Sequence, residues 1–162
     1  MMKRYSSNVR KLGLDECFLD ITASVRQRME SREADSVQEF VGHLYGYSAG
    51  FRADPSTDCD CGCIQRLRIA SACAQEIRHA LATELGFQTC GGVFVNKNLA
   101  KLVGDLHKPN QQTTLLPQNA HSMISPMRMR EIPGCGFRLT HRLAEMNIHT
   151  AAELQRIPLA LL

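Results

Sequence analysis

Apolar residues recur every three or four positions between residues 63 and 85, and this is the clearest periodic pattern in the chain. The stripe consists of Ile64, Leu67, Ala70, Ala74, Ile77, Leu81 and Leu85. A stripe with this spacing predicts an amphipathic helix. Gly86 follows at once and is the residue type that most often ends a helix. The pattern therefore predicts one long helix over residues 63–85.

Two short apolar runs near the start predict a β-hairpin. Residues 9–14 and 17–22 both have the character of strands, and the second alternates apolar and polar positions. Asp15 and Glu16 lie between them, as a two-residue connection. Because Asp-Glu is not a favoured turn pair, we expect these residues to be there for another reason.

The remaining pattern up to residue 116 alternates strands with helices. It predicts a helix or loop at 23–35, an edge strand within 37–47, a strand at 89–95, a helix at 97–107 and a strand at 112–116. Asn96 is the expected N-cap of the helix at 97–107. This order predicts an α+β fold, a sheet with helices packed on one side.

After Pro117 the pattern becomes entirely helical. It predicts a helix at 122–131 broken near Pro126, a helix at 136–146 and a third helix that ends before Pro158. Thr150 and Glu153 have the spacing of a capping box that opens this third helix. We therefore expect a boundary between two subdomains near residues 116–119.

Charge adds a hint about the partner. The net charge is only +3, but from Lys97 onward eight Lys and Arg residues face four Asp and Glu residues. A basic half suits a polyanionic ligand, although a solvated charged surface would look the same.

The longest apolar runs are far shorter than the roughly 20 residues of a membrane helix. The start of the chain has no apolar stretch behind its positive charges, so no secretory signal is expected.

Seven cysteines without such a signal indicate a reducing compartment and free thiols. Cys59, Cys61 and Cys63 form a CxCxC motif that invites a zinc interpretation. Structural zinc sites usually use CxxC pairs and four ligands. The surrounding Gly, Asp, Pro and Ser residues favour a surface loop instead.

The segment LGLDECFLDIT resembles the palm motif of Y-family DNA polymerases. The resemblance implies that Asp15 and Glu16 are catalytic carboxylates that bind Mg²⁺, with Mn²⁺ as the alternative ion. Paired carboxylates repel each other unless a cation lies between them, and Mg²⁺ prefers such oxygen ligands. Asp20 matches a further aspartate of the family, for which we expect a supporting role.

The segment GVFVNKNLAKLVGDLHKPNQQTTLLP resembles a second part of the same family, most of all its iota branch. The resemblance implies that Lys97 contacts the triphosphate of the incoming nucleotide. A lysine in the first turn of a helix is a reasonable phosphate site. Without the resemblance, Lys97 and Lys101 would be read as surface lysines one turn apart.

The segment REIPGCGFRLTHRLAEMNIHT resembles the helix-hairpin-helix of the Y-family thumb. Gly134, Cys135 and Gly136 would offer backbone N–H groups to a DNA phosphate, and Arg138 and Arg142 would add charge. Such contacts bind DNA without reading its sequence.

Together these resemblances imply an interior fragment of a DNA-directed DNA polymerase of translesion synthesis and DNA repair. Residues 1–117 would be part of a ferredoxin-like palm with an antiparallel or mixed sheet, and residues 118–162 a truncated thumb. The implied partners are primer-template DNA, an incoming dNTP, and replication or repair factors such as a sliding clamp, bound through regions outside this chain. The implied location is the nucleus.

One element of the family motif is missing. No acidic residue precedes Asp15, whereas the family carries a metal-bridging Asp on an N-terminal strand. We therefore expect negligible polymerase activity from these residues alone. The alternative is a DNA-binding module that keeps the helix-hairpin-helix and has lost the chemistry.

Overall fold

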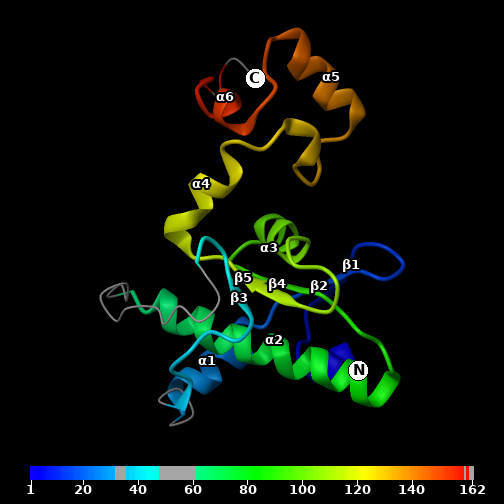
Figure 1. Ribbon diagram of the computed structural model, residues 1–162, viewed down its shortest axis with the longest axis vertical. Coiled ribbons are helices and arrows are strands. Elements are labelled where there is room, and N and C mark those ends of the chain that lie inside the picture. The colour runs from blue at the N-terminus through cyan, green and yellow to red at the C-terminus, as the bar shows by residue number, and fades with distance from the viewer. Residues whose placement is uncertain (32–35, 48–60, 159, 161–162) are drawn as a thin grey trace. The chain divides into compact units, whose positions relative to one another are not determined.

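The computed structural model describes residues 1–31, 36–47, 61–158 and 160 (Figure 1). The chain divides into two compact units, Met1–Leu116 and Pro117–Leu162.

Helix α2 spans Cys63–Leu85, as its apolar stripe predicts. Its buried apolar residues pack with α1 (Thr22–Glu30) and with residues of the sheet in the main core of the first unit. Gly86 ends the helix in the left-handed region, at φ +72°. Leu85 departs from the stripe, since it is 51% exposed at the last turn.

The sheet beside α2 has three short parallel strands. They are β3 (His43–Leu44), β4 (Gly91–Val93) and β5 (Gln112–Thr114), in the order β3-β5-β4. Gly92 pairs with Thr113, and His43 pairs with the same Thr113 from the other side. Helix α3 (Lys97–Gly104) connects β4 to β5 and begins at Asn96, whose side chain accepts a hydrogen bond from the Leu99 N–H at 2.9 Å.

Helices cover both faces of this sheet, and the prediction of helices on one face is wrong. A Cβ on Gly91 would point at Arg78 of α2, whereas a Cβ on Gly92 would point at Ala100 of α3. Consecutive strand residues face opposite sides of a sheet, so α2 and α3 lie on opposite faces (Figure 1). The strand order explains this arrangement. The chain passes from β3 through α2 to β4, beyond β5, and then back through α3 to β5. Connections between parallel strands follow a right-handed rule, so two connections that run in opposite directions place their helices on opposite faces.

Gly92 allows α3 to lie directly on the backbone of β4. A Cβ at this position would come within 1.7 Å of the Ala100 carbonyl oxygen and 2.7 Å of the Gly104 nitrogen. Only a residue without a side chain fits such an approach. This contact fixes the height of α3, and of the lysines it carries, above the sheet.

A separate antiparallel hairpin precedes the sheet. It pairs β1 (Val9–Lys11) with β2 (Cys17–Leu19) in the register Val9 to Leu19. The hairpin was predicted, but residues 12–16 form its tip instead of a two-residue connection. The expected single antiparallel or mixed sheet is thus, among the described residues, one antiparallel pair and one parallel sheet.

The second unit contains short helices around a small core. They are η4 (Pro117–Asn119), α4 (Ala120–Ile124), η5 (Met129–Glu131), α5 (Phe137–Glu145) and α6 (Ala151–Gln155). Met129, Leu143 and Ile148 form the centre of this core. The helical break near Pro126 is confirmed, since α4 ends at Ile124 and η5 begins at Met129. The capping box is also confirmed, because Thr150 and Glu153 exchange side-chain hydrogen bonds with each other's backbone.

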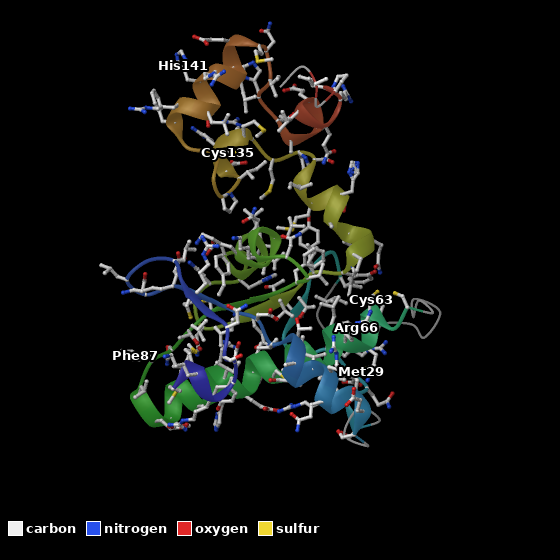
Figure 2. All side chains as sticks on the ribbon, turned by 180° about the vertical axis from the view of Figure 1, so that it is seen from behind. Met29, Cys63, Arg66, Phe87, Cys135 and His141 are labelled. Carbon is white, nitrogen blue, oxygen red and sulfur yellow. The ribbon has the colours of Figure 1, made fainter. Side chains whose placement is uncertain are left out.

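The CxCxC motif lies only partly within the described residues. Cys59 is outside them, Cys61 is exposed, and Cys63 starts α2 and packs against the core (Figure 2). Over the described ranges, no group of three or more His, Cys, Asp or Glu side chains is arranged to hold a metal ion. None of the helices described is both long enough and apolar enough to cross a membrane.

Candidate functional site

Asp15 and Glu16 lie at the tip of the β1–β2 hairpin, and both are exposed. The tip is closed by its own backbone, since the N–H groups of Leu12 and Gly13 donate to the Glu16 carbonyl at 2.9 and 3.4 Å. These bonds hold the backbone of Glu16 while leaving its carboxylate at the surface. The hairpin therefore presents two neighbouring carboxylates outward.

Lys101 of α3 contacts one carboxylate of this pair, that of Glu16. Its Nζ lies 2.6 Å from Oε1 of Glu16, with 26% of the lysine side chain and 43% of the glutamate side chain exposed. A partly exposed ion pair of this kind contributes at most about 1 kcal/mol. A divalent cation or a phosphate can therefore exchange with either partner at little cost.

The sequence did not single out Lys101 for this position. The available signal was its spacing from Lys97, four residues along the same helix, but nothing local indicates which of the two lysines reaches the hairpin.

A second cation, Lys108, lies near Glu16. The Asp105 carboxylate raises the pKa of Lys108, and Glu16 adds a smaller contribution in the same direction.

Lys97, the predicted nucleotide-binding residue, lies in the first turn of α3 and is exposed. No hydrogen bond or ion pair of its side chain is found within the described part of the chain. The side chain is thus available at a helix N-terminus, where N–H groups and the helix dipole favour an anion. Lys97 therefore differs from Lys101, whose side chain is already paired with Glu16.

Asp20 has a structural role at the end of the hairpin. Its Oδ1 accepts a hydrogen bond from the Thr22 N–H at 3.0 Å, at the entry to α1. The hydrogen bonds from Thr22 hold the pKa of the Asp20 carboxyl below its usual value. The carboxylate thus stabilises the first residue of α1, which agrees with the supporting role expected for it.

The donor set at the hairpin tip is compatible with Mg²⁺. Asp15 and Glu16 offer hard carboxylate oxygens, and Mg²⁺ is commonly held by one or two carboxylates together with substrate phosphates. These two residues would hold the ion. The described residues contribute no third acidic ligand at this place.

In the second unit, Gly134, Cys135 and Gly136 form the turn before α5. Gly134 has φ +96°, which a residue with a side chain rarely adopts. The N–H of Cys135 donates to the Ile132 carbonyl at 3.0 Å, and the side chain of Cys135 packs against the core. Cys135 therefore closes the turn with its N–H group.

The exposed N–H groups of this region come instead from Gly134, Gly136 and the first turn of α5. The first intrahelical bond runs from Thr140 N–H to the Gly136 carbonyl at 3.0 Å, so the N–H groups of Phe137, Arg138 and Leu139 precede it. The Arg138 side chain is exposed beside them. Phe137 is 85% exposed, and its ring lies 6.1 Å from that of His141 on the same helix, which Figure 2 labels.

Comparison with known proteins identifies the family. Residues 1–105 match the model of the impB/mucB/samB family. The chain belongs to this family. It is 38% identical over 157 residues to DNA polymerase iota of Drosophila melanogaster and 37% identical over 163 residues to DNA polymerase iota of Mus musculus. It is 27% identical over 162 residues to DNA polymerase IV of Escherichia coli O157:H7.

These relatives are Y-family DNA polymerases, so the predicted family is confirmed. The match covers 96% and 98% of this chain in the two iota relatives but only 21% and 22% of their own lengths. The bacterial relative is covered over 35% of its length. The chain thus spans about a fifth to a third of the curated relatives it matches.

The fold is similar to that of a solved polymerase. The chain superposes on a structure described as an insertion ternary complex of Dbh DNA polymerase with a TM-score of 0.65. The superposition covers 97% of this chain and 35% of that one, at 19% identity. At this identity the similarity concerns the fold alone.

Proposed function

We propose that the chain is part of the palm and thumb of a translesion DNA polymerase and takes part in metal-dependent nucleotidyl transfer. Residues 1–117 would form part of the palm, and residues 118–162 part of a helix-hairpin-helix thumb. Primer-template DNA and an incoming dNTP are the expected partners, in line with the ternary complex named for the Dbh relative. The expected location is the nucleus, as part of DNA repair.

The observation that carries this proposal is the pair of exposed carboxylates at the hairpin tip, with Lys101 2.6 Å from one of them. Bound Mg²⁺ would supply positive charge for the nucleotide phosphates and acidify the primer 3′-hydroxyl. Asp15 and Glu16 would orient that ion through their oxygens. Lys101, once released from Glu16, would be free to contact a phosphate oxygen, and Lys97 would bind phosphate at the N-terminus of α3.

The second unit would hold DNA by its backbone. Gly134, Gly136 and the first turn of α5 present N–H groups at an exposed surface, and Arg138 adds a positive charge there. Contacts of this kind go to phosphates and fix the position of the duplex without reading bases. Each phosphate neutralised contributes about 0.9 to the slope of log affinity against log salt.

The chemical part of the proposal is tested by primer extension in the full-length polymerase. Asp15→Asn and Glu16→Gln should each nearly abolish extension, because each removes a charged metal ligand, while primer-template affinity stays unchanged. Asp105→Asn is the matched control, since it makes the same change of charge at an exposed residue that pairs with Lys108. Normal extension by both site variants would refute the assignment.

The proposed DNA contact of the second unit is tested by measuring the DNA affinity of this chain by gel shift over a series of salt concentrations. Arg138→Ala should weaken binding equally for all duplex sequences and reduce the salt slope by about 1. Arg156→Ala is the control, because it removes an exposed arginine outside the turn and α5. Equal salt slopes for wild type and Arg138→Ala would contradict this role. Intact DNA binding without any extension in the full-length protein would favour the DNA-binding module instead.

A further inference from the structure

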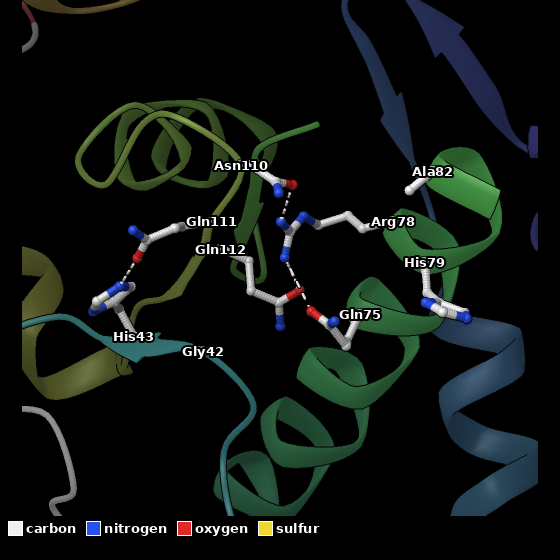
Figure 3. Close-up of a pocket in the computed structure, with 9 residues that line it drawn as sticks. All are labelled: Gly42, His43, Gln75, Arg78, His79, Ala82, Asn110, Gln111 and Gln112. Carbon is white, nitrogen blue, oxygen red and sulfur yellow. Dashed lines mark hydrogen bonds between the residues drawn. The ribbon is translucent and has the colours of Figure 1, made fainter. Parts of the chain in front are cut away.

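A polar pocket of about 350 Å³ lies between α2 and the residues that lead into β3 and β5 (Figure 3). Its lining combines a guanidinium, two imidazoles and several amide side chains. The lining includes His43, Gln75, Arg78, Asn110, Gln111 and Gln112. No residue that lines this pocket is acidic, and none belongs to the hairpin, α3 or the second unit.

Arg78 brings a positive charge into this pocket without a carboxylate to balance it. Its Nε donates to the Thr89 carbonyl at 2.8 Å, and its Nη2 donates to the Asn110 amide oxygen at 2.9 Å. Its Nη1 donates to the amide oxygens of Gln75 and Gln112 at 3.0 and 3.4 Å. All four acceptors are neutral, and no ion pair of Arg78 is found among the described residues.

A partly buried cation normally has a counter-charge, because desolvation penalises the charged form. Burial lowers the pKa of Arg78, which is the direction expected when that counter-charge is missing. One hydrogen of Nη2 also remains without an acceptor in the described structure. The guanidinium is therefore held in place but not electrostatically balanced.

The amide side chains around Arg78 are oriented by it. Because a guanidinium only donates, Gln75 and Asn110 must turn their oxygens toward Arg78. The oxygen of Gln111 is likewise taken by Nε2 of His43. The three NH₂ groups that remain have no acceptor among the residues the structure describes. The oxygens of these three side chains are therefore occupied, and their NH₂ groups remain available as hydrogen-bond donors.

The pocket is also held in one arrangement before any ligand binds. The ring of His43 stacks on that of His107 at 3.8 Å and 5°, and His107 is hydrogen-bonded to the Thr113 hydroxyl at 2.9 Å. Gln112, which lies at the back of the pocket, is fixed by its amide N–H bonds to Val41 and Ser71 carbonyls, both at 2.8 Å. Preorganised donors bind more tightly, because less side-chain entropy is lost on binding.

We propose that this pocket binds a phosphate group, either free phosphate or the terminal phosphate of a phosphomonoester, with Arg78 and three amide side chains as donors. The edges of the guanidinium fork are already occupied, which disfavours a planar carboxylate held by two parallel bonds. A tetrahedral anion has several oxygens that can accept from separately placed donors. The bound anion supplies the negative charge that Arg78 lacks.

The test is calorimetric titration of the 162-residue chain at constant ionic strength. The probes are inorganic phosphate, thymidine 5′-monophosphate and a thymidine dinucleotide without a terminal phosphate. Saturable binding of either of the first two, with no binding of the dinucleotide, is the expected result, and the tighter of the two identifies the source of the phosphate. Absence of saturable binding by both, or equal binding of the dinucleotide, would overturn the proposal.

The variant that tests the pocket itself is Gln75→Glu. A glutamate keeps an oxygen acceptor for Arg78, so unit 1 should unfold at the same temperature as the wild type or higher. It also replaces an amide donor with a negative charge, so phosphate affinity should fall about tenfold or more. Gln155→Glu, the same change at an exposed residue that does not line the pocket, should bind as the wild type does.

Two outcomes with these variants would also overturn the proposal. One is wild-type phosphate affinity in Gln75→Glu, which would place the bound phosphate elsewhere. The other is an equal loss of affinity in Gln155→Glu, which would make the effect one of net charge. Because no probe needs Mg²⁺, a primer or polymerisation, the result is independent of the polymerase function proposed above.

Discussion

The close approach of α3 to β4 makes Gly92→Ala the most informative single substitution. The added Cβ would lie 1.7 Å from the Ala100 carbonyl oxygen, whereas ordinary contact begins at 3.4 Å. The obstructing atoms belong to the backbone, so no side-chain rotation relieves the overlap. Helix α3 would have to recede from the strand by about 1.7 Å, the difference between these two distances.

Such a displacement has an energetic and a functional consequence. Overpacking of this kind costs typically about 1–3 kcal/mol, and rigid backbone neighbours place this site at the upper end. A loss of about 3 kcal/mol corresponds to a decrease of roughly 6–12 °C in melting temperature for a chain of this size. The same shift would lengthen the 2.6 Å contact between Lys101 and Glu16, because Lys101 moves with the helix.

Tyrosine fluorescence during urea unfolding is the suitable assay. The chain has three tyrosines and no tryptophan, and Tyr5, Tyr45 and Tyr47 all belong to the first unit. The signal therefore reports on the unit that contains the substitution. Its free energy of unfolding follows from linear extrapolation to zero urea.

Gly91→Ala is the matched control. Its Cβ would meet only the Arg78 Cδ at 3.4 Å and the Gln112 Cβ at 3.5 Å, which are ordinary contacts. We expect it to change stability by less than about 1 kcal/mol. If both variants unfolded at the same urea concentration, the direct packing of α3 on β4 would be refuted.

Three further outcomes are expected. Thr114→Val should stabilise the first unit by about 1–2 kcal/mol in the same urea assay, because the fully buried Thr114 hydroxyl has no hydrogen-bond partner in the described structure; a loss of stability would show that the hydroxyl is satisfied. Burial and the neighbouring His43 lower the pKa of His107, so the unfolded chain binds protons more readily and stability should fall as pH drops below about 6.5. His107→Gln should lessen that pH dependence, and an identical pH profile would remove His107 as its source. Thr150→Ala removes the N-cap of α6 and should cost the second unit about 1 kcal/mol, seen as faster hydrogen exchange of the Glu153 amide; unchanged exchange would count against the cap.

The elements best predicted from the sequence are those set by local chemistry. Helix α2 has the bounds that its stripe and Gly86 imply, and the caps at Asn96 and Thr150 are made by the side chains expected to make them. In each case the determining residues lie within a few positions of one another. Propensity, capping and backbone conformation are then enough to decide the structure.

The arrangement of the sheet could not be obtained in this way. Strands of two or three residues carry too little pattern to specify partner or direction, so neither the parallel pairing nor the packing of α2 and α3 on opposite faces was predicted. The candidate site shows the same limit. Asp15 and Glu16 were found from a local motif, but the choice of Lys101 over Lys97 as their neighbour depends on how α3 lies on β4.

The contact between Lys101 and Glu16 has a consequence for the order of events in folding. The two residues are 85 positions apart, and closing a loop of that length costs about 4 kcal/mol of chain entropy. An exposed ion pair recovers at most about 1 kcal/mol of this. The pair therefore forms only after the sheet and α2 have brought the two segments together. Mutations at either residue should change the unfolding rate and leave the folding rate almost untouched, so the candidate site is among the last features of the unit to be assembled.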